Sequence, residues 1–401
     1  MKSNKDVPGT GKIPRGAESY IPFHRPTLGA AEEQALIEVL RSGWLTRGQK
    51  TAEFEQLFAD YVGARHAVAV NSCTAALHLA LLCAGVGPGD EVVTTPFTFA
   101  ATANAIEHTG ARVAFADIAP DSLNLDPAQA RGCINRRTRA LLPVHFGGRP
   151  CDMDAISGLA RENGLAVIED AAHALGASFG QHQVGSLSDF TAFSFYATKN
   201  ITTGEGGMLT TEDDALAARA RVLSLHGMSA DSWQRYGRRG HAYYEVQEPG
   251  FKYNMFDLQA ALGVEQLKRC GAMQARRAEL AALYGRELAG CPFVELPSPQ
   301  DGSENAYHLY VVRLRLDRLR LDRDAVAGAM ENCNIGVSVH FHALHRHPYF
   351  RERYSLSPSD FPVADEMSDR VLSLPLYPSL TDSQARQVAE VLVSILEQNS
   401  M

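Results

Sequence analysis

Lys199 is the residue whose surroundings in this chain most favour covalent chemistry. It lies in SFYATKNITTGEGG, residues 194–207, between an apolar aromatic run and an uncharged glycine-rich turn, and the nearest charged residues are Asp189 and Glu205. An ammonium group taken out of water loses its proton or finds a partner, and a neutral amine forms a Schiff base with an aldehyde. The alternative is a lysine whose stem packs at a strand end while its ammonium group reaches solvent.

A second stretch, VIEDAAHALG at residues 167–176, favours the covalent interpretation. A buried-strand pattern ends there at Asp170, and His173 follows three residues later. A cofactor with an aldehyde, a phosphate and a pyridine ring needs a lysine for the aldehyde and a carboxylate that keeps the ring nitrogen protonated. Lys199 and Asp170 are candidates for these two roles. The alternative for Asp170 is a simple helix cap.

The same cofactor needs a phosphate site and a flat partner for its ring. Ser72 and Thr74 follow a short apolar run and precede a helical segment, so their hydroxyls, together with that of Ser194, suit a phosphate at a helix N-terminus. Phe99 is the candidate for the flat partner. Plain N-capping by the hydroxyls and a core position for Phe99 are the alternatives. Taken together, the set predicts pyridoxal 5'-phosphate as the cofactor.

Alternating strands and helices must position these residues. Short runs rich in Val, Ile and Ala alternate with amphipathic helical segments, which predicts a parallel sheet covered on both faces. The predicted strands cover residues 66–70, 91–95, 112–115, 140–144, 165–168 and 206–211. Ligands of such sheets gather at the carboxyl ends of the strands, and each candidate residue falls at or just past such an end.

The chain is long enough for two domains. We expect a flexible arm over residues 1–20, a large cofactor-binding domain over 21–270 and a smaller α+β domain over 271–401. In the small domain the pattern predicts strands at 309–316 and 335–341 and helices at 324–331 and 382–397. The long polar loop at 226–250 is typical of an active-site or subunit-contact loop.

Composition excludes several classes of protein. The 401 residues carry a net charge of -8 with scattered Lys and Arg, so no basic face for nucleic acid is expected. The longest charge-free run, residues 67–89, is interrupted by polar residues and ends in Gly and Pro, which argues against a membrane span. Seven widely spaced cysteines without a C-x-x-C motif indicate reduced thiols in a cytoplasmic enzyme.

From residue 21 to the C-terminal helix, the chain resembles the nucleotide-sugar aminotransferases of the DegT/StrS family, a branch of the fold-type I pyridoxal-phosphate enzymes. The motifs that carry the resemblance are SGWLTRG, AVNSCTAALHLAL, PFTFAATANAI, PVHFGG, IEDAAHALGASF, SFYATKNITTGEGG, PGFKYNMFDLQAALG and SLPLYPSLT. The resemblance implies a mostly parallel seven-stranded sheet between helices and a homodimer with shared active sites. It also implies amino transfer from L-glutamate, which leaves 2-oxoglutarate, to a nucleotide-linked keto sugar.

The resemblance also implies roles for single residues. Lys199 matches the Schiff-base lysine, which afterwards moves the proton between the amino-acid carbon and the cofactor carbon. Asp170 matches the partner of the pyridine nitrogen, and His173 matches the histidine beside the ring. Phe99 matches the aromatic residue that stacks on the ring, although the most similar relatives tend to carry Trp there.

Further matches concern the phosphate and the second subunit. Thr74, Ala75 and Ser194 match the phosphate contacts of the family. Asn254 matches the asparagine that reaches across the dimer interface to the neighbour's phosphate, so each site would need two subunits.

On the substrate side, Thr46, His340 and His345 match positions that face the sugar nucleotide. GWLTRGQK, KNITTGEGG and VHFHALHRHPYFRERY are most similar to members that make UDP-4-amino-4-deoxy-L-arabinose. This implies a 4-keto sugar such as a UDP-4-keto-pentose or a 4-keto-6-deoxyhexose. The histidines at 341–346 differ from those of these members, which leaves the sugar open.

Four alternatives remain. The first is a 3-keto sugar aminotransferase, and the second is a sugar dehydratase on the same scaffold, whose members carry His in place of Lys199. A dinucleotide oxidoreductase is disfavoured because AVAVNSCTAAL lacks the G-x-G-x-x-G turn. A non-catalytic sensor that only binds the cofactor is the last. The histidines between 340 and 347 could form a zinc site, but we expect no metal.

Overall fold

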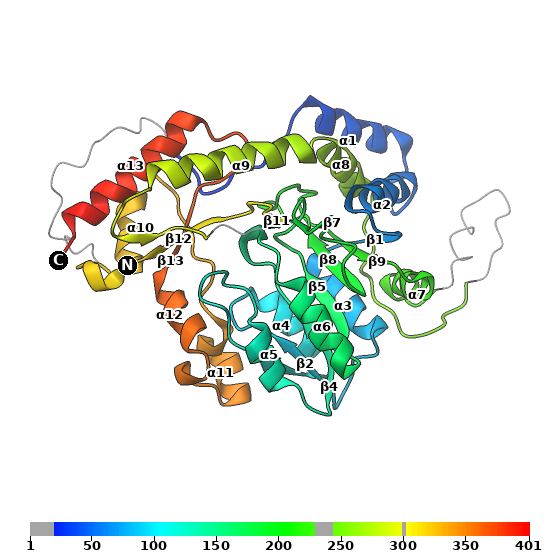
Figure 1. Ribbon diagram of the computed structural model, residues 1–401. Coiled ribbons are helices and arrows are strands. Elements are labelled where there is room, and N and C mark those ends of the chain that lie inside the picture. Colours follow the sequence, from blue (N-terminus) through cyan, green and yellow to red (C-terminus); the bar gives the residue numbers. More distant parts are fainter. Residues whose placement is uncertain (1–19, 229–243, 299–301) are drawn as a thin grey trace, which may run out of the picture.

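The computed structural model describes residues 20–228, 244–298 and 302–401 (Figure 1). The predicted arm at 1–20 and most of the predicted loop at 226–250 lie outside these residues.

A seven-stranded sheet forms the centre of the protein and confirms the predicted α/β class. Its order is β1-β9-β8-β5-β4-β2-β3. The strands are β1 (His66–Val70), β2 (Glu91–Thr94), β3 (Arg112–Phe115), β4 (Thr138–Leu142), β5 (Ala166–Asp170), β8 (Phe190–Ser194) and β9 (Gly207–Thr211). All of the pairings from β8 to β3 are parallel, whereas β9 is antiparallel to both β1 and β8.

Helices cover both faces of this sheet, because its strands are apolar on both sides. One face packs against α3 (Cys73–Cys83), α4 (Ala100–His108) and α7 (Asp214–Ser224). The other face packs against α5 (Pro127–Cys133) and α6 (Met153–Asn163), and, near β1, against α2 (Gln49–Val62) and α8 (Asp257–Lys268). Almost every residue of α3 is buried, which explains why its sequence carries no charge.

The reversed strand β9 brings its first residue, Gly207, to the edge of the sheet where β1 and β8 end. Gly207 is opposite Val70 on one side and Ser194 on the other. A Cβ at Gly207 would lie 2.5 Å from the carbonyl carbon of Ser72. The glycine therefore lets β9 pass directly beneath the turn that begins α3.

We expect Gly207→Ala to lower the free energy of unfolding by about 1–3 kcal/mol, because the added methyl group must displace backbone atoms. Gly87→Ala is the matched control, since nothing lies within 4 Å of a Cβ at that position. Urea unfolding of the two variants measures the difference. Equal unfolding free energies would contradict the close approach seen here.

The C-terminal part adds a second layer around a three-stranded antiparallel sheet of β10 (Val294–Glu295), β12 (Tyr310–Leu314) and β13 (Val371–Leu374). Figure 1 shows α9 and α13 together on one side of this sheet. Its helices are α9 (Cys270–Glu287), α10 (Arg323–Asn332), α11 (Pro348–Tyr354), α12 (Pro362–Arg370) and α13 (Asp382–Gln398). The remaining elements are α1 (Ala30–Ser42), the small sheet of β6 (Ser178–Phe179), β7 (His182–Gln183) and β11 (Ser303–Glu304), and 3-10 turns at Phe146–Gly148, Leu316–Arg318, Leu344–Arg346 and Pro358–Asp360.

The predicted strand at 335–341 is wrong. This segment makes only isolated bridges, from Ile335 to Ile21 and from Ser338 to Ser373. Gly336 packs against the backbone of Phe23, so the segment is held by the chain that precedes α1, and it meets β13 at a single bridge without forming a strand.

Each part of the chain, as divided at the predicted domain boundary, contributes side chains to the hydrophobic core of the other part. Ile21 packs in the C-terminal core, whereas Phe350 and Phe361 of the C-terminal part pack in the core of the large sheet. Arg269 separates α8 from α9 next to this boundary. The boundary at 270 stays a prediction.

Candidate active site

A cavity of about 510 Å³ lies at the edge of the sheet where β1, β5 and β8 end and β9 begins. Of the residues that sequence reasoning selected, the cavity is lined by Ser72, Thr74, Phe99, Asp170, His173, Ser194, Lys199 and His340. Residues more than 260 positions apart thus meet at one place, as expected for the carboxyl ends of parallel strands.

Lys199 lies in the turn after β8, where its backbone N–H donates to the carbonyl of Tyr196 at 2.9 Å. Burial lowers the pKa of Lys199 to about 8, against the opposing influence of Cys73 and Asp170. The side chain lines the cavity and is partly buried, so it does not reach open solvent as a snorkelling lysine would. Near neutral pH a sizeable fraction of such an amine is uncharged and nucleophilic.

This lowered pKa predicts how the protein, freed of cofactor, captures an aldehyde. The neutral amine is the reacting species, so the rate of capture should rise with pH and level off above about 8. The measurement is the rate of absorbance change after pyridoxal phosphate is added across a pH series. A rate that continues to rise towards about pH 10.5, the range of an ordinary lysine, would contradict the buried position.

Asp170 is the last residue of β5 and is only 5% exposed. Its Oδ2 accepts from the hydroxyl of Thr102 at 2.8 Å, and its Oδ1 accepts from the N–H of Ala172 at 3.1 Å. Burial raises the pKa of Asp170, whereas these two hydrogen bonds and nearby Lys199 lower it. A carboxylate held in this way is stabilised further by a protonated ring nitrogen, so the site suits a pyridinium group.

His173 and Phe99 bring two rings to the cavity. The backbone N–H of Gly147 donates to Nδ1 of His173 at 3.3 Å, and burial lowers the pKa of His173 well below its usual range. The imidazole is therefore neutral, with its hydrogen on Nε2. Phe99, the residue before α4, is 67% exposed, so it is available to stack on a flat ligand and is not a core residue.

The N-terminus of α3 lies at the other end of the cavity. The hydroxyl of Ser72 accepts from the N–H of Ala75 at 3.1 Å, so Ser72 does cap this helix. Thr74 lines the cavity, where the first N–H groups of α3 have no helical acceptor and favour an anion. Ala75 itself is buried and does not line the cavity, and its N–H is already bonded.

Two other predicted residues lie outside the cavity of this chain. Asn254 forms an isolated bridge with Val70 at the end of β1, and its side-chain Nδ2 donates to the carbonyl of Met255 at 3.2 Å. Its Oδ1 is buried and has no hydrogen-bond partner among the described residues. Thr46 is exposed in the loop after α1, where its carbonyl accepts from the N–H of Asp257 at 3.3 Å.

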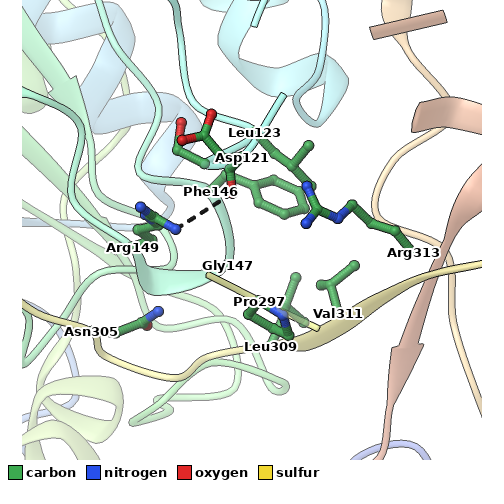
Figure 2. A pocket seen from close by; sticks show the side chains of 11 residues that line it. Asp121, Leu123, Phe146, Gly147, Arg149, Pro297, Asn305, Leu309, Val311 and Arg313 are labelled. Carbon is green, nitrogen blue, oxygen red and sulfur yellow. Dashed lines mark hydrogen bonds between the residues drawn. The ribbon is translucent and has the colours of Figure 1, made fainter. Parts of the chain in front are cut away.

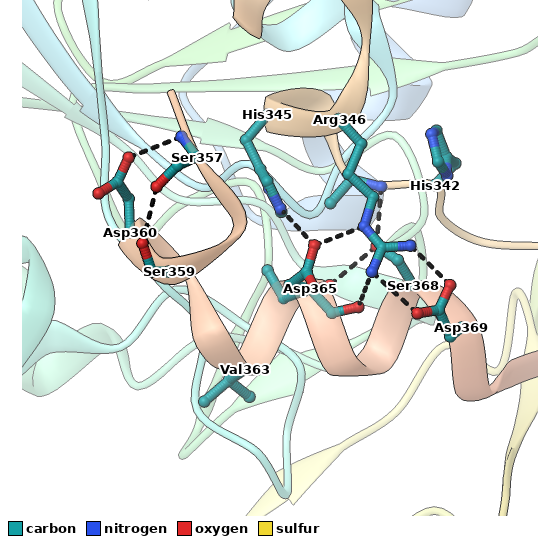
Figure 3. A network of polar contacts seen from close by, with 12 residues as sticks. His342, His345, Arg346, Ser357, Ser359, Asp360, Val363, Asp365, Ser368 and Asp369 are labelled. Atoms are coloured by element: carbon teal, nitrogen blue, oxygen red, sulfur yellow. Dashed lines mark hydrogen bonds and ion pairs between the residues drawn. The ribbon is translucent and has the colours of Figure 1, made fainter. Parts of the chain in front are cut away.

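His345, which was predicted to contact the substrate, does not line the cavity. Its side chain is buried, and its Nε2 lies 3.0 Å from Oδ1 of Asp365 on α12 (Figure 3). Arg346 binds the same carboxylate and that of Asp369. His345 therefore belongs to an ion-pair network that attaches α12. His340 does line the cavity, with Nδ1 at 2.8 Å from the hydroxyl of Ser373.

Several residues that line the cavity were not predicted from the sequence, among them Phe23, Thr102, His308 and Phe341. Thr102 lies one helical turn after Phe99, so its spacing was a usable signal. The other three come from segments before α1 and after residue 300, and no local pattern connects them with the sheet.

A smaller cavity of about 50 Å³ lies behind Gly147, between Arg149 and Arg313 (Figure 2). The side chain of Arg149 donates to the carbonyls of Asp121 and Ser298. This cavity therefore belongs to the joint between the large sheet and the C-terminal part, and no predicted site residue points into it.

Over the ranges 20–228, 244–298 and 302–401, no three His, Cys, Asp or Glu side chains gather as metal ligands would. Within the same ranges, no helix has the length and apolar character needed to cross a membrane.

Comparison with known proteins assigns the chain and its fold to a class. This protein is a fold-type I, pyridoxal-phosphate-dependent sugar aminotransferase. The cavity fits this cofactor, because one edge of the sheet presents an amine of lowered pKa, a buried carboxylate and an open helix N-terminus. Residues 26–393 match the DegT/DnrJ/EryC1/StrS aminotransferase family, and the chain belongs to that family.

Similar proteins cover almost the whole chain. The Bacillus subtilis spore coat polysaccharide biosynthesis protein SpsC is 51% identical over 94% of this chain and 97% of its own length. The putative sugar aminotransferase Spr1654 of Streptococcus pneumoniae, in its PMP form, is 30% identical, with a TM-score of 0.89 over 94% of this chain and 99% of its own. DesV of S. venezuelae, solved with a ketimine intermediate, is 34% identical, with a TM-score of 0.86 over 94% of this chain and 99% of its own.

Proposed function

We propose that this enzyme moves an amino group from L-glutamate to a keto group, at C4, of a nucleotide-linked sugar in two half-reactions. The observation that carries the proposal is Lys199, a lysine of lowered pKa in the cofactor cavity beside Asp170. A relative that is 51% identical is named for spore coat polysaccharide biosynthesis, which supports an activated sugar as the acceptor.

Each of the chain's own groups has a role in this proposal. When bound, pyridoxal phosphate supplies a ring that withdraws electrons from the carbon that loses its proton. Asp170 keeps the ring nitrogen protonated, and Thr102 holds the carboxylate in place at 2.8 Å. Once displaced by the amine of a substrate, Lys199 Nζ takes the proton from the substrate carbon and later returns it. Phe99 and His173 orient the ring, and the N-terminus of α3 with Thr74 and Ser194 binds the phosphate.

The test separates the two half-reactions. Enzyme incubated with L-glutamate should release 2-oxoglutarate, detected by mass spectrometry, and should change its visible spectrum. A panel of 3-keto and 4-keto sugar nucleotides is then added to the aminated enzyme. The 4-keto sugars should restore the original spectrum and yield a product in which nitrogen replaces the keto oxygen. Loss of oxygen without gain of nitrogen would instead identify a sugar dehydratase, and no response to any sugar would refute the proposal.

We also propose that the enzyme works as a homodimer with shared sites. Phe256, which is 39% exposed, lies two residues after Asn254, and Trp44 and Leu45, which are 42% and 46% exposed, precede Thr46. Apolar side chains exposed next to both residues support an interface there. It would bring Asn254 and Thr46 to the neighbour's cavity. The seven free cysteines support the expected cytoplasmic location.

Mixed dimers provide a direct prediction. Lys199→Ala and Asn254→Ala subunits should each be impaired alone, because each homodimer carries the same defect in both sites. The two variants are mixed, unfolded and then refolded together. Half of the resulting dimers then contain one intact site, so about a quarter of the wild-type sites return. Aminotransferase activity of the mixture measures this gain. Activity no higher than the mean of the two separate variants would show that Asn254 serves its own subunit.

A further inference from the structure

His308 is a cavity residue with no assigned role. It is 6% exposed, lines the cavity and precedes β12. The centre of its ring lies 4.4 Å from that of His173, and the two planes are inclined by 37°. His308 therefore packs directly against the histidine that the proposed function places beside the cofactor ring.

The protonation of His308 is determined by Asn200, the residue after Lys199. The side-chain Nδ2 of Asn200 donates to the carbonyls of Leu175 and Ala306, at 3.3 and 2.9 Å. Its Oδ1, an acceptor only, lies 3.1 Å from Nδ1 of His308. The hydrogen in this contact must therefore come from His308, so the neutral imidazole carries it on Nδ1 and keeps its lone pair on Nε2.

The backbone around His308 is held from the opposite side by Arg277 of α9, which is 1% exposed. One guanidinium nitrogen of Arg277 donates to the carbonyls of Tyr307, His308 and Leu376, at 3.3, 3.5 and 2.9 Å. Arg277 thus holds the backbone of His308, and Asn200 holds its ring. His308 has little freedom to turn.

The groups whose charges affect the pKa of His308 are basic. Burial lowers the pKa of His308 well below its usual range, and the charges of His173, Lys199, Arg277 and His340 lower it further. A proton on this ring would add a positive charge beside Lys199, which must itself gain and lose a proton. A neutral His308 therefore leaves Lys199 free to gain and lose its proton.

We propose that His308 is a positioning residue for amino transfer: Asn200 holds it as the neutral Nδ1–H tautomer, in which it supports the ring of His173 and adds no charge beside Lys199. This inference rests on the proposed function for its catalytic consequence. The tautomer of His308 and its control by Asn200 do not depend on which substrate the enzyme uses.

The test is histidine 15N NMR of the cofactor-loaded enzyme, with the signal of His308 assigned by its loss in His308→Asn. In the wild type we expect a neutral Nδ1–H imidazole from about pH 6 to pH 8. In Asn200→Asp the new carboxylate favours the imidazolium, so His308 should be doubly protonated over the same range. A wild-type ring with its hydrogen on Nε2, or a charged one, would overturn the inference without any variant.

The kinetic part uses the half-reaction with L-glutamate. Asn200→Asp should lower its rate by about tenfold near neutral pH, and its acid limb should move to higher pH as His308 becomes charged. His308→Asn, whose amide can still donate to Asn200, should keep the wild-type acid limb because it cannot take up a proton. A purely structural role predicts lower stability with unchanged pH profiles, and that result would overturn the inference. If the tautomer is as expected but no amino acid reacts, the proposed function fails instead.

Discussion

Lys199→Ala should lower the rate of amino transfer by about a thousandfold or more, and it should remove the covalent attachment of the cofactor. The variant lacks the amine that we propose bonds the aldehyde, and it also lacks the base that we propose moves the proton. No other lysine lines the cavity in the part of the chain that the structure describes, so no neighbouring amine can substitute.

Two variants serve as controls for this result. Lys199→Arg keeps a positive charge in the cavity but cannot form the bond, so it should be nearly as inactive as the alanine variant. Lys268→Ala removes an exposed lysine of α8 that pairs with Glu265, and it should keep full activity. The measurements are the glutamate half-reaction and mass mapping after borohydride reduction. Cofactor attached to any residue other than Lys199 would contradict the assignment.

Asp170→Asn should lower the rate of the glutamate half-reaction by about a hundredfold to ten-thousandfold. The amide is uncharged and of similar size, so the fold around the end of β5 should remain. It no longer favours the protonated ring nitrogen, and the ring then withdraws electrons less well. The variant should still bind the cofactor through Lys199, which separates this effect from that of Lys199→Ala.

Asp117→Asn is the matched control for Asp170→Asn. Asp117 is also 5% exposed, and its carboxylate accepts from the N–H groups of Val363 and Ala364, away from the cavity. We expect lower thermal stability and an unchanged rate per folded enzyme. Thr102→Val, which removes one hydrogen bond from Asp170, should give an intermediate loss of activity. If Asp170→Asn retained the wild-type rate, the role of this carboxylate would be refuted.

The strands of the large sheet were predictable because each is a short apolar run that is buried on both faces, and this signal is local. The direction of β9 was not predictable from such a run. It follows from the connection at 195–206, which contains no crossover helix, and from Gly207, whose missing side chain allows the close approach to Ser72. The segment at 335–341 has the composition of a strand, but the chain before α1 holds it instead.

Within the site, the residues found from sequence lie at or shortly after the ends of strands of the large sheet, with the exception of His340. Asp170 and Lys199 are unusual in their own surroundings, since each is a charged residue at the end of an apolar run. His345 has a similar sequence neighbourhood to His340, yet Asp365 and α12 bury it. His308, Phe23 and Phe341 could not be found from sequence, because nothing near them in the chain distinguishes them from core residues.

The sequence by itself indicated the alternation of strands and helices, the candidate lysine, the candidate carboxylate and the family, because these depend on short segments and on ordered motifs. The tertiary structure alone decided which histidines reach the cavity, which way β9 runs and how Asn200 and Arg277 hold His308. These features depend on contacts between residues that are far apart in the chain, such as Asn200 and His308. Such contacts form only when the whole chain is packed.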